Sequence, residues 1–211
     1  MTFNKNNILN TASYFTETVF QAFYATQFLL VWMHPEKYSV SLVNDLSILI
    51  IFEFIMVHSG VFMSGLPKNI SLYVFVPFYG IFAFGFNASV IDTNIFYIYL
   101  STVLSRMLFA FADVSDEIRM QQLGKSAIKC TFYFFLMFAV ALGHFFIPKL
   151  GLTQEYLQNS NYFSIVKSSG LFIEKPYIPM CMGFLYYLIP VLYFFYVVYK
   201  NITATKEQII G

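Results

Sequence analysis

Residues 42–63 read LVNDLSILIIFEFIMVHSGVFM, a stretch long and apolar enough to cross a lipid bilayer. A helix needs about 20 predominantly apolar residues to span the hydrocarbon core. Glu53 interrupts this stretch near its middle, and His58 follows it. An ionisable group inside a spanning helix costs about 2.5 kcal/mol or more, so it requires a partner or a function. The stretch therefore predicts a membrane protein and provides the first candidate site.

The composition of the whole chain agrees with this prediction. Of its 211 residues, 58% are hydrophobic and only 11% are charged, and the mean hydropathy is +0.65. A soluble domain carries about 25% charged residues, so lipid must contact much of this protein's surface. An open sheet leaves its backbone unsatisfied in lipid, and no segment alternates like a barrel strand. The predicted fold class is all-α, a polytopic helix bundle.

The apolar segments predict a single transmembrane domain over residues 1–211 with about six helices. The expected spans are residues 14–33, 42–63, 71–90, 95–112, 130–147 and 179–199. Pro77 and Pro190 lie inside two of them and predict kinks, because proline cannot complete the helical hydrogen-bond ladder.

The distribution of Lys and Arg predicts the orientation. With six spans, one side of the membrane holds both termini together with Lys5, Lys68, Arg119, Lys125, Lys129, Lys200 and Lys206. The other side holds fewer basic residues: Lys37, Lys149, Lys167 and Lys175. Positive residues concentrate on the cytoplasmic side, so we expect both termini in the cytoplasm. Heavy use of Phe, Tyr, Ile and Asn is typical of an AT-rich gene, and we expect a bacterial inner membrane. The net charge of +1 gives no reason to expect nucleic acid as a partner.

Four ionisable residues form the predicted intramembrane polar cluster: Glu53, Arg106, His58 and Asp45. Residues 42–63 and 95–112 run in the same direction, so His58 and Arg106 lie at matching depth and Glu53 about 7 Å further in. We predict an ion pair between Glu53 and Arg106. Alternatively, Arg106 extends to the cytoplasmic interface and Glu53 is protonated. Asp45 marks either a polar path to Glu53 or the interfacial start of its span.

His58 does not share a helix face with Glu53, since five residues leave about 140° between them. His144 lies near the opposite end of its own span, about 20 Å from His58 along the membrane normal. A single metal or haem iron bound by both histidines is therefore disfavoured, and no cofactor is predicted. Two haems, each with a further ligand, remain an alternative.

A polar stripe lies on the first expected span. Glu17, Gln21 and Tyr24 fall within about 40° of one line on a helix, and such a stripe must face protein or water. The last expected span is rich in tyrosine instead. We interpret these residues as packing and interfacial anchors: Tyr186, Tyr187, Tyr193, Tyr196 and Tyr199.

Two connections are long enough for structure of their own. Residues 113–129 begin with acidic and basic side chains that offer a docking surface for a soluble protein: Asp113, Asp116, Glu117 and Arg119. The simpler alternative is a helix that continues beyond the membrane and ends at Gly124. In residues 148–178 we expect a short helix that lies in the interface or caps the bundle.

These features favour an oligomeric channel or transport subunit over an enzyme. The sequence has no phosphate-binding glycine loop, no HExxH and no CxxC. An alternative function is a membrane sensor or scaffold that recruits a soluble cytoplasmic partner, as in envelope stress or bacterial defence. A second alternative is a haem- or metal-dependent membrane enzyme.

Overall fold

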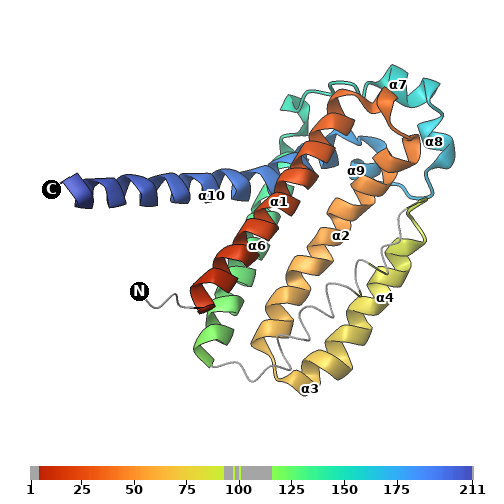
Figure 1. Ribbon diagram of the computed structural model, residues 1–211. Helices are drawn as coiled ribbons and strands as arrows, with labels where there is room; N and C mark the ends of the chain where they lie inside the picture. Colours follow the sequence, from red (N-terminus) through yellow and green to blue (C-terminus); the bar gives the residue numbers. More distant parts are fainter. Residues whose placement is uncertain (1–4, 93–96, 98–99, 101–115, 211) are drawn as a thin grey trace.

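The computed structural model describes residues 5–92, 97, 100 and 116–210. In this part of the chain the regular elements are all helical (Figure 1). The long helices are α1 (Lys5–Met33), α2 (Val40–Gly65), α4 (Val76–Asn87), α6 (Asp116–Leu142) and α10 (Tyr177–Ile210). The short ones are α3 (Lys68–Ile70), α7 (Gln154–Asn159), α8 (Tyr162–Ile165) and α9 (Leu171–Glu174), with 3₁₀ turns at Pro35–Lys37 and His144–Phe146. The predicted all-α class is confirmed for the described residues.

Three of the described helices are long and apolar enough to cross a membrane. The candidate spans are Val40–Phe62, Leu123–Leu142 and Tyr177–Lys200. Two shorter apolar helices, Thr18–Met33 and Ser71–Asn87, lie where the first and third spans were expected. The span expected over residues 95–112 falls almost entirely outside the described residues. A bundle of six spans is therefore not confirmed.

Both ends of α6 differ from the sequence prediction. The helix stops at Leu142, and His144 lies in the 3₁₀ turn that follows it instead of in a span. At its other end, α6 begins at Asp116 and passes through Gly124, so a helix end at Gly124 is wrong. A glycine inside a helix costs only about 1 kcal/mol relative to alanine, and the apolar residues after Gly124 continue the helix.

Pro77 alters the turn in front of it. A proline ring clashes with the carbonyl four residues earlier, which here belongs to Tyr73. The chain forms a π-helical stretch, Ser71–Phe75, in which Val76 N–H donates to the Ser71 carbonyl. Wider turns of this kind relieve local strain within α-helices. The predicted distortion at Pro77 thus takes the form of a widened turn, whereas α10 continues through Pro190 without ending.

α2 is the most enclosed of the three candidate spans and lies between α1 and α4 (Figure 1). In its apolar segment 56% of the residues are buried, against 17% in α6 and 22% in α10. Leu46 and Ile50 pack in one hydrophobic cluster with residues of α6 and α10. Ile48 and Phe52 pack in a second cluster with residues of α4. Residues four apart share a helix face, so α2 is covered on two faces.

α1 packs directly against α10. The ring of Tyr187 on α10 stacks on Tyr24 and Phe28 of α1, with centroid distances of 5.2 and 5.9 Å. Gly183 permits this approach, because a Cβ at that position would overlap the Phe28 ring. Beyond this contact the C-terminal part of α10 extends away from the bundle (Figure 1).

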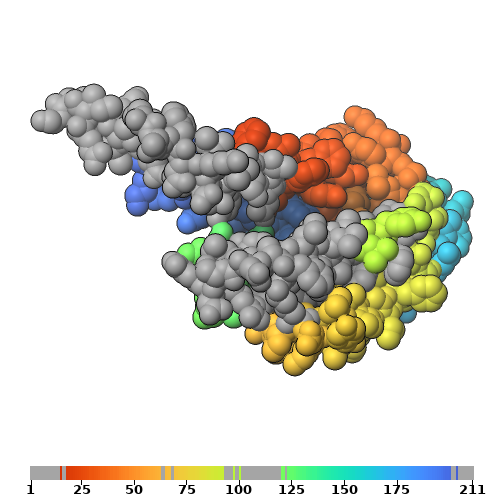
Figure 2. Space-filling view, turned by 60° about the horizontal axis from the view of Figure 1, so that its bottom comes forward, coloured from red at the N-terminus to blue at the C-terminus, as the bar shows by residue number. Residues whose placement is uncertain are grey.

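The residues between α6 and α10 cover one end of the bundle, and we call them the cap. The Trp32 indole at the end of α1 donates to the Pro148 carbonyl at 3.1 Å. Within the cap, the Tyr162 hydroxyl donates to the Ile173 carbonyl at 2.9 Å, and burial raises the pKa of Tyr162. The part of the cap that contains α7 and α8, coloured cyan, lies beside the end of α4 in two views (Figures 1 and 2). One short helix was expected here, and the cap contains α7, α8 and α9.

We expect Gly183→Ala to lower the thermal stability of the detergent-solubilised protein. The added methyl group overlaps the Phe28 ring, and overpacking costs about 1–3 kcal/mol. Gly85→Ala is the matched control, because no described atom lies within 4 Å of a Cβ at Gly85 and alanine is the better helix former. An unfolding midpoint for Gly183→Ala at or above that of Gly85→Ala would contradict the packing of α1 on α10.

Candidate functional site

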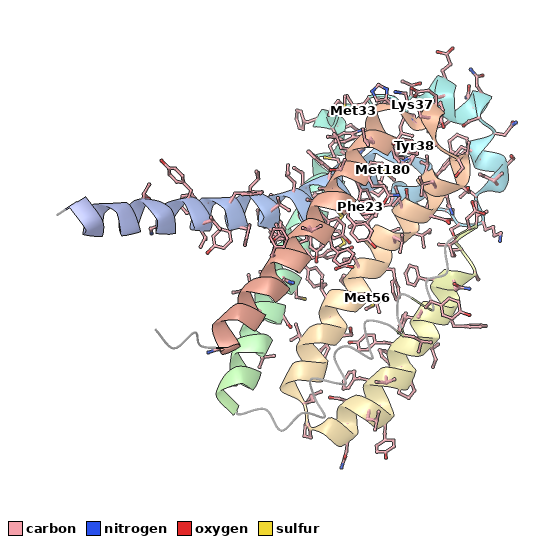
Figure 3. All side chains as sticks on the ribbon, in the orientation of Figure 1. Phe23, Met33, Lys37, Tyr38, Met56 and Met180 are labelled. Atoms are coloured by element: carbon pink, nitrogen blue, oxygen red, sulfur yellow. The ribbon has the colours of Figure 1, made fainter. Side chains whose placement is uncertain are left out.

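The candidate site is built around Glu53, which lies in the middle of α2, one turn before Met56 (labelled in Figure 3). The hydroxyl of Tyr186 on α10 donates to Glu53 Oε1 at 3.1 Å. Tyr186 is only 7% exposed, so this hydrogen bond lies inside the protein. Hydrogen bonds to charged acceptors contribute about 1.5–3 kcal/mol. The bond links α2 to α10 and gives Glu53 a polar partner inside the protein.

Two further tyrosines surround this pair. The ring of Tyr133, on α6, lies edge-on to Tyr186 at 5.5 Å, and its hydroxyl donates to the Ile50 carbonyl at 2.6 Å. The ring of Tyr187 lies 5.0 Å from that of Tyr186. Because Tyr187 also stacks on Tyr24, the four helices α1, α2, α6 and α10 all contribute to the surroundings of Glu53. We call Glu53, Tyr133, Tyr186 and Tyr187 the Glu53 site.

The sequence alone does not assign Tyr186 to a polar site. Its pattern predicts a packing or anchoring residue, because an apolar helix with many tyrosines offers no local signal that distinguishes one of them. Its partner Glu53 lies 133 positions earlier in the chain. Only the crossing of α2 and α10 brings the hydroxyl and the carboxylate together.

Residues of the predicted stripe on α1 lie close to this region. Tyr24 faces α10 through its stacking on Tyr187, and Gln21 is half-buried. Glu17 lies in α1, but its side chain is outside the described part of the structure. Arg106, the predicted ion-pair partner of Glu53, also lies outside the described residues, so that pair stays a prediction.

His58 is directed toward α6. Its Nδ1 lies 2.7 Å from the Phe54 carbonyl, one turn earlier in α2. Its ring packs against those of Phe54 and Phe134, with centroid distances of 4.1 and 4.8 Å. A ring nitrogen that bonds to a carbonyl must carry the proton, which leaves Nε2 as the acceptor of a neutral imidazole. The histidine is thus held between aromatic rings of two helices.

Asp45 fastens the turn that follows α4. It is fully buried, and its two carboxylate oxygens accept hydrogen bonds from the backbone N–H groups of Ile91, at 2.8 Å, and Asp92, at 2.9 Å. The neighbouring Asn44 amide donates to Asp45 at 3.2 Å and to the Ser89 carbonyl at 3.1 Å. Two hydrogen bonds from backbone N–H groups stabilise a buried carboxylate in place of water. This geometry gives Asp45 a structural role at the α2–α4 contact.

The remaining predicted residues occupy other places. Asp113 lies outside the described residues, and Asp116, Glu117 and Arg119 lie in the first turns of α6, with side chains that are likewise not described. His144 Nδ1 lies 2.9 Å from the Ala141 carbonyl. Within the described part of the chain, no group of three or more His, Cys, Asp or Glu side chains is placed to hold a metal ion.

No known protein family, curated protein or solved structure matches this chain. The three apolar helices are compatible with a membrane protein. No relative supports a channel, a sensor or an enzyme, so the interpretation of the site depends on its own chemistry.

We expect Asp45→Ala to release the turn after α4. The substitution removes the acceptor of two backbone N–H groups, and each lost hydrogen bond costs about 1 kcal/mol. Hydrogen exchange measured by mass spectrometry should show faster exchange at Ile91 and Asp92. Ser47→Ala is the control, since the buried Ser47 hydroxyl donates to the Val43 carbonyl of the same helix. Equal protection of the turn in both variants would contradict the role of Asp45.

Proposed function

We propose that this protein is a membrane transport subunit in which Glu53 takes up and releases protons or small cations. The observation that supports the proposal is the hydrogen bond from Tyr186 to Glu53 within a helix apolar enough to span a bilayer. Ionisable residues of spanning helices that face other helices are typical of proton relays and ion pathways. A carboxylate attracts cations and repels anions, so cations or protons are the substrate class.

The chemistry of the Glu53 site is suited to repeated loading and release. An ionised Glu53 accepts the Tyr186 hydroxyl. A protonated Glu53 can donate to the same oxygen, because a phenol serves either as donor or as acceptor. The carboxyl group therefore changes its charge without losing its hydrogen bond, and burial of a partnerless polar group is avoided in both states.

We further propose that the subunit works as a homo-oligomer in the bilayer. Most of the apolar segments of α6 and α10 are exposed, since only 17% and 22% of these segments are buried. Both helices therefore have faces that another copy is able to contact. Arg106 is the proposed counter-ion of Glu53 in the ionised state, through the long reach and fixed charge of the guanidinium group.

Glu53→Gln should abolish flux into vesicles that contain the purified protein, without lowering the yield of folded protein. The amide has nearly the shape of the acid but exchanges no proton and carries no charge. Flux is measured with a pH-sensitive dye inside the vesicles, with and without a gradient of monovalent cations. Tyr186→Phe should reduce flux less, because the carboxylate remains. Tyr193→Phe is the matched control, as its ring is 67% exposed on the same helix.

Two results would contradict the proposal. Normal flux in assembled Glu53→Gln would remove Glu53 from the pathway. Wild-type vesicles that pass neither protons nor monovalent cations would contradict transport itself.

A membrane scaffold is the second candidate function, and the start of α6 supports it. The helix begins at Asp116, seven residues before its spanning part begins at Leu123. This leading segment carries Glu117 and Arg119 and precedes the apolar part of the helix, and we propose that it is the segment a soluble protein binds.

Neutralising Asp113, Asp116 and Glu117 together should remove a soluble partner from pull-downs of the membrane protein. Glu155→Gln is the control, because Glu155 is an exposed carboxylate on α7 of the cap. A partner list that is identical for both variants would count against the scaffold.

A further inference from the structure

The turn after α6 exposes two phenylalanines at the end of a candidate span. The spanning part of α6 ends at Leu142, and the 3₁₀ turn His144–Phe146 follows almost at once. Phe145 is 81% exposed and Phe146 is 91% exposed. Apolar rings in this position are unfavourable in water and favourable among lipid acyl chains.

A lysine from another segment lies over this turn. The Nζ of Lys175, which comes shortly before α10, lies 3.1 Å from His144 Nε2 and 5.9 Å from the centre of the Phe145 ring. His144 Nδ1 bonds to the Ala141 carbonyl, so Nε2 is the nitrogen that accepts from the ammonium group. The contact with His144 and the attraction between the ammonium and the aromatic face hold Lys175 at the turn.

The positive charge of Lys175 is not neutralised by a described carboxylate. The adjacent Glu174 accepts a hydrogen bond from the Gly170 N–H at 3.2 Å. Among the described residues the one contact within 4.0 Å between a basic side chain and a carboxylate joins His34 and Glu36. Since His144 accepts one N–H of the ammonium group, that group retains N–H donors for a further acceptor.

We propose that the 3₁₀ turn His144–Phe146 and Lys175 form a binding site for the headgroup of an anionic phospholipid. Phe145 and Phe146 lie in the headgroup layer against the upper ends of the acyl chains, and the Lys175 ammonium pairs with the lipid phosphate. The proposal depends on membrane insertion of α6 and is independent of transport by Glu53.

Depth along α6 favours lipid over a soluble partner. Phe145 and Phe146 are three and four residues past the last residue of the span, which is about 6–8 Å at the rise of a 3₁₀ helix. The headgroup layer on each side of the hydrocarbon is about 5–8 Å thick. The two rings and the ammonium group therefore lie in the layer that contains the phosphates, where long basic side chains extend toward the headgroups.

Quenching of Trp32 by brominated lipids tests the site. Trp32 is the only tryptophan in the chain, and its indole bonds to Pro148, which lies just after the turn. The full-length protein is reconstituted in vesicles doped with either brominated phosphatidylglycerol or brominated phosphatidylcholine. We expect about a fivefold preference for the anionic quencher, the effect of one lysine near an anionic headgroup.

Lys175→Gln should abolish this preference, and Lys175→Arg should retain it. Lys37→Gln is the matched control, because Lys37 is an exposed cation at the same end of the bundle (labelled in Figure 3). An unchanged Trp32 emission maximum in each variant verifies that the cap is folded.

Equal quenching of the wild type by both lipids would overturn the proposal, as would a preference that survives Lys175→Gln. A loss of preference in Lys37→Gln as large as in Lys175→Gln would attribute the effect to net charge and not to this site.

Discussion

The polar groups of α2 constrain how the neighbouring helices pack, because each of them requires a hydrogen-bond partner in an apolar layer. Asp45 obtains its partners from the turn after α4. Glu53 obtains a partner from α10 through Tyr186. His58 bonds to a carbonyl of its own helix and packs against a ring of α6. Three neighbouring elements thus contact polar side chains of one helix, and a shift of α10 or of the turn after α4 would break the hydrogen bonds to Glu53 or Asp45.

This arrangement also explains the difference in burial among the candidate spans. α2 carries the polar groups and is more than half buried, whereas α6 and α10 carry mainly apolar and aromatic side chains and are mostly exposed. Apolar faces need no protein partner in a bilayer, since lipid tails are as apolar as leucine. Polar side chains do need one, so the helix that carries them lies at the centre. The proposed transport role depends on the enclosed surroundings of Glu53. The proposed lipid site depends on the exposure of the turn after α6.

The length and hydropathy of the apolar segments were enough to predict a helical membrane protein and the approximate position of α2. Helix ends were less predictable. The sequence placed His144 within a span, whereas α6 ends at Leu142, because an apolar 3₁₀ turn has the same composition as a helix end. It also ended a helix at Gly124, where the following apolar residues override the weak preference of glycine. A distortion before Pro77 was predictable, since the missing N–H is a local property, but its π-helical form was not.

The sequence by itself determined that ionisable groups lie within apolar helices, since residue type and position alone decide this. It also separated Glu53 from His58 around α2, because helical geometry fixes the angle between them. Only the tertiary structure decided the partners: Tyr186 for Glu53, the turn at Ile91 for Asp45, and Lys175 for His144. These pairs join residues 31 to 133 positions apart. A hydrogen bond depends on the position of two atoms to within a few tenths of an ångström, and no local pattern of residues specifies how distant helices approach one another.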